Sequence, residues 1–249
     1  MTIVPIPAFR DNYIWMLIHG RNAAVVDPGD AAPVLSYLQQ HDLSLRAILA
    51  THFHNDHIGG IGPLLQHLDA PVYAPQNSVF DFAYTPVKEH DDILLPELET
   101  TLRVLDVPGH TAVHVAYYGG NSLFCGDTLF GCGCGRIFDG SCEQLHYSLQ
   151  KLAQLPDDTQ VYCGHEYTLD NIRFALSVDP HNHELIQRQA DSEALVAQGL
   201  PTLPSSMALE KATNPFLRCH TPALQSVTNM KRDVAVFCTL REMKNHFKL

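Results

Sequence analysis

The sequence lacks any apolar run that approaches the roughly 18–20 residues of a membrane-spanning helix. Its first residues, Met1-Thr2-Ile3-Val4-Pro5, show neither the basic nor the apolar segment of a secretory signal. Internal repeats and low-complexity tracts are also missing. With 45% hydrophobic and 17% charged residues, the chain is therefore expected to be a globular protein with a substantial core and no membrane partner.

Cysteine is sparse, and its number is odd. The seven cysteines fall at irregular spacing, which predicts reduced thiols in a cytoplasmic protein. Cys132 and Cys134 form a C-x-C pair within "GCGCGR". That spacing alone is a weak signal for a metal or redox site, so we interpret both as incidental thiols of a glycine-rich loop.

Positive charge is scarce as well, with 16 Lys and Arg residues against 27 acidic ones and a formal net charge of −11. This balance argues against a nucleic-acid partner, which would require a basic surface. Residues 229–249 are the exception, because they carry five Lys or Arg residues and only two acids. This segment is either a local anion site or a solvated helix face, and charge alone favours the solvated face.

The pattern of apolar residues changes near residue 168. Before it, short runs rich in Val, Ile, Leu and Tyr predict strands at 3–7, 13–19, 23–27, 47–51, 72–74, 102–107, 114–118, 122–125 and 160–163. Helical spacing is found at 33–40, 60–68, 143–155, 169–178, 184–197 and 230–247. We therefore expect an α/β catalytic domain over residues 1–168 and a small α-helical domain without strands over 169–249.

Potential metal ligands follow the predicted strands. "THFHNDHIGG", residues 51–60, contains His52, His54, Asp56 and His57 directly after one strand. Three further ligands follow other strands, each with a glycine immediately before it: His110, Asp127 and His165. Glycine permits the tight turns that direct such side chains into a shared cleft.

These seven side chains exceed the needs of one tetrahedral site and suit two metal ions if one carboxylate bridges them. Imidazole and carboxylate together favour Zn²⁺, with Fe²⁺ or Mn²⁺ as alternatives. A closed structural zinc site is disfavoured because such sites are usually rich in cysteine and this set has none. We predict two divalent metal ions per chain, most simply zinc.

The motif from Thr51 to His57, together with Pro108-Gly109-His110-Thr111 and Gly126-Asp127-Thr128, resembles the metallo-β-lactamase superfamily. The resemblance implies an αββα sandwich with a dinuclear site at one edge. It assigns His52, His54 and His110 to the first metal and Asp56, His57 and His165 to the second. Asp127 would bridge the two, and Asp56 would also orient the attacking hydroxide as a catalytic residue.

Further segments resemble glyoxalase II, the family of hydroxyacylglutathione hydrolases, over nearly the whole chain. They include Val26-Asp27-Pro28-Gly29, Cys134-Gly135-Arg136-Ile137-Phe138 and Asn214-Pro215-Phe216-Leu217-Arg218. The resemblance implies hydrolysis of S-D-lactoylglutathione to glutathione and D-lactate in methylglyoxal detoxification. It also implies a glutathione thioester as partner, held by Arg136, Phe138, Tyr167, Arg241 and Lys244, with Phe138 where relatives often carry Tyr.

The basic C-terminal segment agrees with this substrate. Glutathione carries two carboxylates and one ammonium, so a protein of net charge −11 would repel it without a local basic cluster. Arg241 and Lys244, spaced i and i+3 on a predicted helix, supply one. For residues 229–249, a local anion site is therefore favoured over a solvated helix face.

In the expected mechanism, a water that bridges both metals loses a proton and attacks the thioester carbonyl. The thiolate leaves without a strong general acid, since thiols titrate near about 8.5. Alternatives are another thioesterase or lactonase of the same fold, a mononuclear iron persulfide dioxygenase, and a metal-bound protein without catalysis. We expect a monomer.

Overall fold

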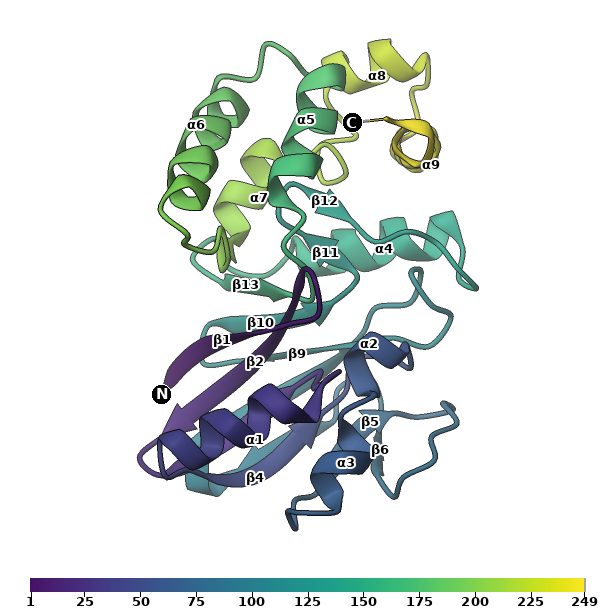
Figure 1. Cartoon of the computed structure of the whole chain (residues 1–249). Helices are drawn as coiled ribbons and strands as arrows, with labels where there is room; N and C mark the ends of the chain where they lie inside the picture. The colour runs from purple at the N-terminus through teal and green to yellow at the C-terminus, as the bar shows by residue number, and fades with distance from the viewer. Residues whose placement is uncertain (249) are drawn as a thin grey trace. The chain divides into compact units, whose positions relative to one another are not determined.

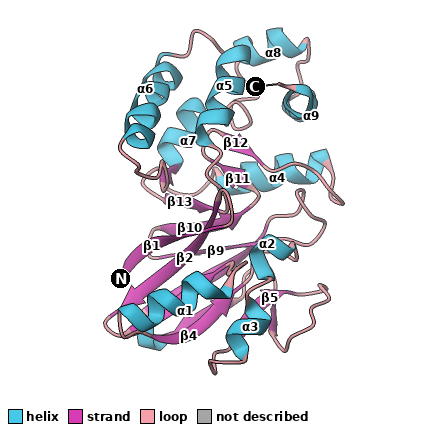
Figure 2. Ribbon diagram, viewed as in Figure 1, coloured by secondary structure: helices cyan, strands magenta, loops and turns pink. Residues whose placement is uncertain are grey.

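The computed structural model describes residues 1–248, which fold as two compact units. The N-terminal unit contains residues 1–106 and 113–126, and the C-terminal unit contains residues 107–112 and 127–248. Strands predominate in the first unit and helices in the second (Figures 1 and 2). The two units are described separately below.

The N-terminal unit contains two β-sheets. Six strands form the first sheet in sequence order: β1 (Thr2–Ala8), β2 (Asn12–His19), β3 (Asn22–Val26), β4 (Ser44–Leu49), β5 (Val72–Pro75) and β6 (Thr85–Val87). Strands β1 to β3 pair antiparallel, whereas β3 to β6 pair in parallel. The part of the second sheet that lies in this unit has the antiparallel order β10-β9-β8-β7, formed by β7 (Asp92–Leu95), β8 (Thr100–Asp106), β9 (Val115–Gly119) and β10 (Ser122–Gly126).

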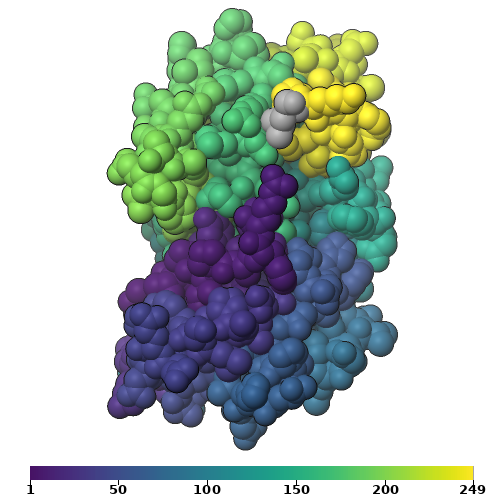
Figure 3. All heavy atoms as spheres, in the orientation of Figure 1, coloured from purple at the N-terminus to yellow at the C-terminus, as the bar shows by residue number. Residues whose placement is uncertain are grey.

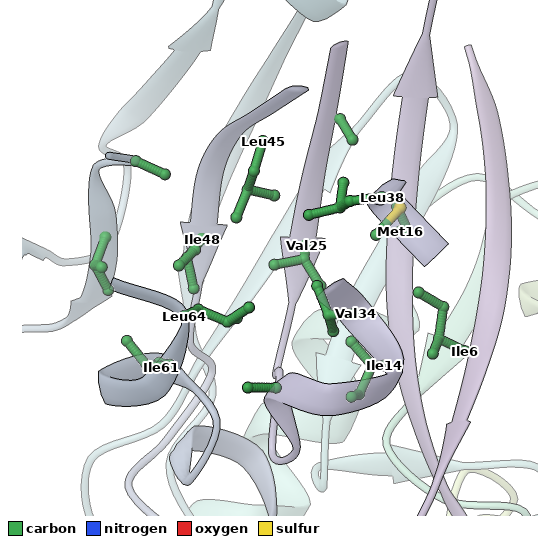
Figure 4. Packing of buried hydrophobic residues seen from close by; sticks show 14 of the residues in the cluster. Ile6, Ile14, Met16, Val25, Val34, Leu38, Leu45, Ile48, Ile61 and Leu64 are labelled. Carbon is green, nitrogen blue, oxygen red and sulfur yellow. The ribbon is translucent and has the colours of Figure 1, made fainter. Parts of the chain in front are cut away.

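Short helices connect the parallel strands: α1 (Ala31–Gln40), α2 (Asn55–Ile58) and α3 (Ile61–Leu65). A 3-10 turn at Pro96–Leu98 lies between the antiparallel strands β7 and β8. Helix α1 begins where the Asp30 carboxylate accepts a hydrogen bond from the backbone N–H of Ala32 at 3.0 Å. Its Val34 and Leu38 lie four residues apart and face the first sheet (Figure 4).

An apolar cluster of this unit lies between α1, α3 and the first sheet. In Figure 4, Val34 and Leu38 of α1 pack against Val25 of β3, and Leu64 of α3 lies near Ile48 of β4. Each such fully buried side chain contributes about 1.5–3 kcal/mol relative to exposure. Packing on this scale fixes the ends of the strands from which the candidate ligands extend.

Hydrogen bonds also connect the two sheets of the N-terminal unit. The Tyr117 hydroxyl, from β9, donates to the carbonyl of Ala50 just after β4, at 2.7 Å. Tyr117 is fully buried, and burial raises the pKa of its phenol well above the usual value. The tyrosine is therefore a neutral donor inside the sandwich.

The C-terminal unit is mainly helical. Its helices are α4 (Cys142–Leu152), α5 (Thr168–Val178), α6 (His183–Ala197), α7 (Met207–Thr213), α8 (Pro222–Thr228) and α9 (Asp233–His246). Short strands accompany them: β11 (Leu129–Phe130), β12 (Gly133–Cys134), β13 (Gln160–Cys163) and β14 (Ser205–Ser206). Helix α4 begins with a capping box, in which Ser141 and Gln144 satisfy each other's backbone N–H groups.

A buried ion pair organises the helices of this unit. Arg188 of α6 donates to the Glu210 carboxylate of α7 at 2.5 Å, and both side chains are almost completely buried. The other Glu210 oxygen accepts from the backbone N–H of Cys132 at 2.9 Å and from the Asn214 amide at 3.0 Å. The glycine-rich loop near Cys132 is thereby tied to helices much later in the chain.

The α/β architecture and the nine expected strand regions are confirmed, with shifted ends for some. Strands β6, β7, β11, β12 and β14 and helices α2, α7 and α8 were not predicted, because each is short and lacks a clear apolar period. The expectation that strands disappear after residue 168 is therefore wrong at β14. The proposed domain boundary at residue 168 stays a prediction.

The expectation of uniformly reduced thiols is wrong for two residues. Cys142 and Cys238 form a disulfide across a sequence separation of 96 residues, whereas the other five cysteines are buried and belong to no disulfide. Sequence spacing cannot reveal a pair that only the packing of α4 against α9 brings together. None of the helices within residues 1–248 combines the length and the apolarity needed to cross a membrane.

Candidate metal centre

Four of the predicted ligands belong to the N-terminal unit. His52 lies just beyond β4, and its Nε2 is 3.1 Å from Nδ1 of His54. The short helix α2 carries Asp56 and His57, with His57 Nε2 3.5 Å from Asp56 Oδ2. His52 and His57 are buried, and their ring centroids are 4.3 Å apart. The structure thus gathers these four side chains at one end of the first sheet.

A buried carboxylate, Asp27, orients two of these imidazoles. Asp27 follows β3 and is only 4% exposed. Its carboxylate accepts hydrogen bonds from the backbone N–H and the hydroxyl of Thr51, both at 2.7 Å, and lies 3.0 Å from His57 Nδ1. Since a carboxylate only accepts, Nδ1 of His57 carries the proton, and Nε2 carries the lone pair that can bind a metal.

The tautomer of His52 follows from the same network. The Thr51 hydroxyl gives its proton to Asp27, so at its 3.0 Å contact with His52 Nδ1 the hydroxyl oxygen accepts. His52 therefore also carries its proton on Nδ1 and its lone pair on Nε2. Both imidazoles are prepared as neutral donors for a cation.

Two further residues support this cluster. The Asn12 amide donates to Asp56 Oδ2 at 3.0 Å, which fixes the orientation of that carboxylate. His114 is buried, and its ring stacks on His52 with centroids 4.6 Å apart. Gly126 ends β10 with a φ of +48°, and a Cβ there would collide with Thr51 and His114. Only glycine suits that position.

The other three predicted ligands belong to the C-terminal unit and converge on one another. Asp127 Oδ2 is 3.5 Å from His110 Nε2 and 3.4 Å from His165 Nε2, and all three residues are buried. His110 Nδ1 donates to the carbonyl of Arg136 at 2.6 Å, which places the lone pair of this ring on Nε2 as well. Gly109, with a φ of +142°, lies against Leu145 of α4 where a Cβ would not fit.

Three predicted substrate-binding residues lie beside these ligands. The Phe138 ring is 5.2 Å from the His110 ring, and Phe138 is 62% exposed. Arg136 is exposed and contacts His110 through its backbone carbonyl. Tyr167 stacks on His165 with ring centroids 4.7 Å apart and planes 4° from parallel. An aromatic and basic surface therefore borders the donors of the C-terminal unit.

The side chains of Arg241 and Lys244 in α9 contact other groups of the protein. Buried Arg241 donates to the carbonyls of Cys134 at 2.9 Å and Gly135 at 3.4 Å, and its guanidinium lies over the Phe216 ring. Lys244 Nζ lies 5.3 Å from the centroid of the Phe174 ring. Desolvation, followed by repulsion from Arg241, lowers the pKa of Lys244 to about 8.

The donor chemistry of each unit fits a divalent transition metal. Both units present imidazole nitrogens together with a carboxylate oxygen, a set suited to zinc, iron or manganese. In the N-terminal unit, ligand atoms from Asp27, His52 and His57 all lie within 4.8 Å of one another. The structure therefore supports divalent metal binding.

Sequence reasoning missed Asp27, Thr51 and Asn12 as supporting residues. Asp27 stood within the Val26-Asp27-Pro28-Gly29 segment, but only as part of a family resemblance and without a role. A signal was available, because a buried acid directly after a strand requires hydrogen-bond donors. Its partners Thr51 and His57 lie 24 and 30 residues away, beyond the reach of local patterns.

Comparison with known proteins agrees with this site. Residues 8–165 match the family model of the metallo-β-lactamase superfamily, and residues 166–247 match that of the hydroxyacylglutathione hydrolase C-terminus. A hydroxyacylglutathione hydrolase of Methylobacillus flagellatus is 56% identical over 98% of this chain and 99% of its own length. That of Nitrosomonas europaea is 53% identical over 100% of this chain and 97% of its own length.

Solved structures show the same fold. ETHE1 from Myxococcus xanthus is 25% identical and has a TM-score of 0.71, covering 100% of this chain and 92% of its own. The protein TTHA1623 in a di-iron-bound form is 26% identical with a TM-score of 0.61, covering 87% of this chain and 100% of its own. The αββα fold class with a C-terminal helical region is therefore confirmed. The chain belongs to the hydroxyacylglutathione hydrolases, a family within the metallo-β-lactamase superfamily.

Proposed function

We propose that this chain hydrolyses S-2-hydroxyacylglutathione thioesters, converting S-D-lactoylglutathione to glutathione and D-lactate. One observation carries the proposal. Hydroxyacylglutathione hydrolases match the chain at above 50% identity over nearly their full length, including the C-terminal segment that has its own family model. Methylglyoxal detoxification is the role that this reaction would serve.

The proposal includes two divalent metal ions, with zinc expected and iron or manganese as alternatives. His52, His54 and His110 would hold the first ion, and Asp56, His57 and His165 the second, with Asp127 between them. The protonation of His52, His57 and His110 on Nδ1 supports this assignment, because it leaves Nε2 as the donor in each ring. The di-iron-bound state of the similar protein TTHA1623 supports a count of two.

Metal ions held there would supply a nucleophile at neutral pH by lowering the pKa of bound water, and they would polarise the thioester carbonyl. The protein's own groups position the reactants. Asn12 donates to Asp56, and Asp56 would accept a hydrogen bond from the attacking water. Asp27 would hold His57 in the tautomer that leaves Nε2 as the metal donor.

The substrate-contact residues would bind the glutathione moiety. Arg136 and Lys244 would pair with its carboxylates, while Phe138 and Tyr167 would provide aromatic surfaces next to His110 and His165. Arg241 would act partly through the carbonyls of Cys134 and Gly135, which it holds in place. The leaving thiolate needs no separate general acid, since its pKa is near about 8.5.

The decisive experiment is turnover of S-D-lactoylglutathione by the metal-loaded protein, followed through the loss of thioester absorbance. Rapid hydrolysis is expected, and it should be slowed strongly by Asp56→Asn. A coenzyme A thioester and a lactone serve as comparison substrates. Faster turnover of either one would favour another thioesterase or a lactonase and would remove the glutathione assignment.

Metal analysis of the same sample tests the centre. About two metal ions per chain are expected, whereas a single iron ion would favour the alternative dioxygenase chemistry. We further propose that the chain is a monomer, that it is cytoplasmic and that it has no nucleic-acid or membrane partner. We also propose that its two domains divide at residue 168. Gel filtration of the metal-loaded chain tests the first of these.

A further inference from the structure

The disulfide between Cys142 and Cys238 differs from the other cysteines in its accessibility. Both of its residues are half-buried, whereas the five cysteines outside the disulfide are buried. Burial also raises the pKa of the free thiols where they lie deepest, to about 12 for Cys132. Exchange with a small thiol in solution is therefore expected at the disulfide and not at the buried cysteines.

On one side, the disulfide is anchored in α4, whose first residue is Cys142. This helix supports the segment that precedes His110. Ser148 donates to the carbonyl of Pro108 at 2.6 Å, and Gly109 lies directly against the backbone of Leu145. Helix α4 is thus a fixed support for one predicted metal ligand.

On the other side, the disulfide is anchored in α9, which carries Arg241 and Lys244 three and six residues after Cys238. Arg241 holds the carbonyls of Cys134 and Gly135, and Gly135 immediately precedes Arg136. Helix α9 forms part of the outer surface of the C-terminal unit (Figure 3). The His146 ring of α4 also contacts the Phe237 ring of α9, with centroids 5.4 Å apart.

We propose that Cys142 and Cys238 form a thiol–disulfide exchange site for glutathione, and that its redox state determines how firmly α9 is held against α4. The choice of glutathione rests on the proposed function, because thioester hydrolysis releases this thiol beside the same unit. Charge supports it as well, since residues 229–249 carry five Lys or Arg residues that attract an anionic thiol, against the two acids Asp233 and Glu242.

The exchange is balanced in atoms and electrons. A glutathione thiolate attacks one cysteine sulfur, which breaks the protein disulfide, forms a mixed disulfide and releases the other cysteine as a thiolate that takes a proton from water. A second glutathione thiolate attacks the glutathione sulfur of the mixed disulfide and releases the remaining cysteine. The protein gains two electrons, and two glutathione molecules become one glutathione disulfide. Excess glutathione disulfide drives the reverse reaction.

The first test needs no turnover. The folded, metal-loaded chain is equilibrated in buffers of defined ratio of glutathione to glutathione disulfide, and its free thiols are trapped with an alkylating reagent and counted by intact mass. The expected result is the appearance of two labels as the ratio rises, mapped by peptide mass to Cys142 and Cys238. A pair that stays oxidised at every ratio, or that stays reduced in pure glutathione disulfide, overturns the exchange site.

The second test measures the coupling to α9. Backbone hydrogen exchange over residues 233–246 is expected to be faster in the reduced chain than in the oxidised chain, and the Cys142→Ser/Cys238→Ser variant should match the reduced state in both buffers. Cys219→Ala, which removes a buried free cysteine of the same unit, should keep the redox response. Equal exchange in both redox states overturns the coupling.

A third measurement tests whether the redox state of the Cys142–Cys238 pair affects substrate binding. In the oxidised chain the KM for S-D-lactoylglutathione is expected to be several-fold lower than in the reduced chain, with kcat and metal content unchanged. An equal KM in both states would separate α9 from substrate binding. Complete absence of hydrolysis would refute the proposed function instead, while the thiol counts and hydrogen exchange would still decide on the exchange site.

Discussion

Asp27 and His57 are joined inside the N-terminal unit by a hydrogen bond of 3.0 Å between the carboxylate Oδ2 and the imidazole Nδ1. Neither residue is exposed, and the same carboxylate also binds both polar hydrogens of Thr51. This carboxylate therefore sets the tautomer of His57 directly and that of His52 through the Thr51 hydroxyl. Each ring presents Nε2 for metal binding as a consequence.

We predict that Asp27→Asn weakens metal binding by about 10–100-fold, the range found when a carboxylate behind a metal-binding histidine is lost. The amide can donate a hydrogen bond, so it no longer forces the proton of His57 onto Nδ1. Competition with a chromophoric chelator measures the affinity. Asp92→Asn is the matched control, because Asp92 is an acid of the second sheet that pairs with Arg103 away from the cluster. Equal affinities of the two variants would contradict the orienting role.

The ligands themselves could be predicted from the sequence because they are local. His52, His110 and Asp127 each follow a run of strand-forming residues, and strand ends with glycine turns are places where side chains converge. The strands were recognised by the same local signal. Short elements such as α2 and β14 were missed, because four or two residues cannot display a period.

The supporting contacts could not be predicted because they join distant parts of the chain. Arg241 meets the carbonyl of Cys134 across 107 positions, and the disulfide spans 96. The sequence predicts Arg241 as a glutathione-binding residue on a basic helix, and in the structure its guanidinium is buried on backbone carbonyls. Charge and helical spacing identify such a residue as a candidate for anion binding, but only the packing of α9 shows which groups it contacts.

The buried pair of Arg188 and Glu210 gives a stability prediction. Glu210→Ala should reduce the free energy of unfolding by about 3–5 kcal/mol, because it leaves a buried guanidinium without its carboxylate. It also removes the acceptor for the N–H of Cys132. Replacing both partners, as in Arg188→Met/Glu210→Leu, should cost less than Glu210→Ala alone. Urea denaturation measures all three free energies.

The neighbouring pair of Lys211 and Asp157 is the control for this cycle, because Asp157 is largely exposed and the two are 2.7 Å apart. Lys211→Met should change the free energy of unfolding by no more than about 1 kcal/mol. If Glu210→Ala cost as little as this control, Glu210 would not be the organising acceptor of the C-terminal unit.

The buried imidazole of His146 gives a pH-dependent prediction. His146 is 6% exposed, and neither ring nitrogen has a hydrogen-bond partner. Burial lowers its pKa, and the charge of Asp233 opposes this only in part. The unfolded chain takes up a proton near pH 6.5, above the pKa in the folded chain, so this residue makes stability fall as pH decreases below about 6.5.

His146→Leu should therefore flatten the loss of stability between about pH 7.5 and 5.5, and it should raise the free energy of unfolding at the acidic end, because a leucine has no imidazole to desolvate. Urea denaturation at both pH values provides the comparison. His220→Gln replaces an exposed histidine and should leave the profile as in the parent chain. A profile of His146→Leu that parallels the parent would exclude His146 as a source of acid sensitivity.

Lys244 gives a prediction for substrate binding at alkaline pH. Desolvation and the nearby Arg241 lower its pKa to about 8, so its ammonium is lost over a range in which an ordinary lysine stays charged. If this ammonium pairs with a glutathione carboxylate, the KM for S-D-lactoylglutathione should rise as pH increases through about 8, with little change in kcat. Lys244→Arg should move that rise to higher pH, because a guanidinium remains protonated, and Lys244→Met should give a high KM at every pH.

The ammonium of the substrate titrates identically for all variants, and Lys248→Met controls for the loss of one positive charge near the same helix end. A parent chain whose KM follows the Lys244→Met profile throughout would show that Lys244 contributes no charge to substrate binding.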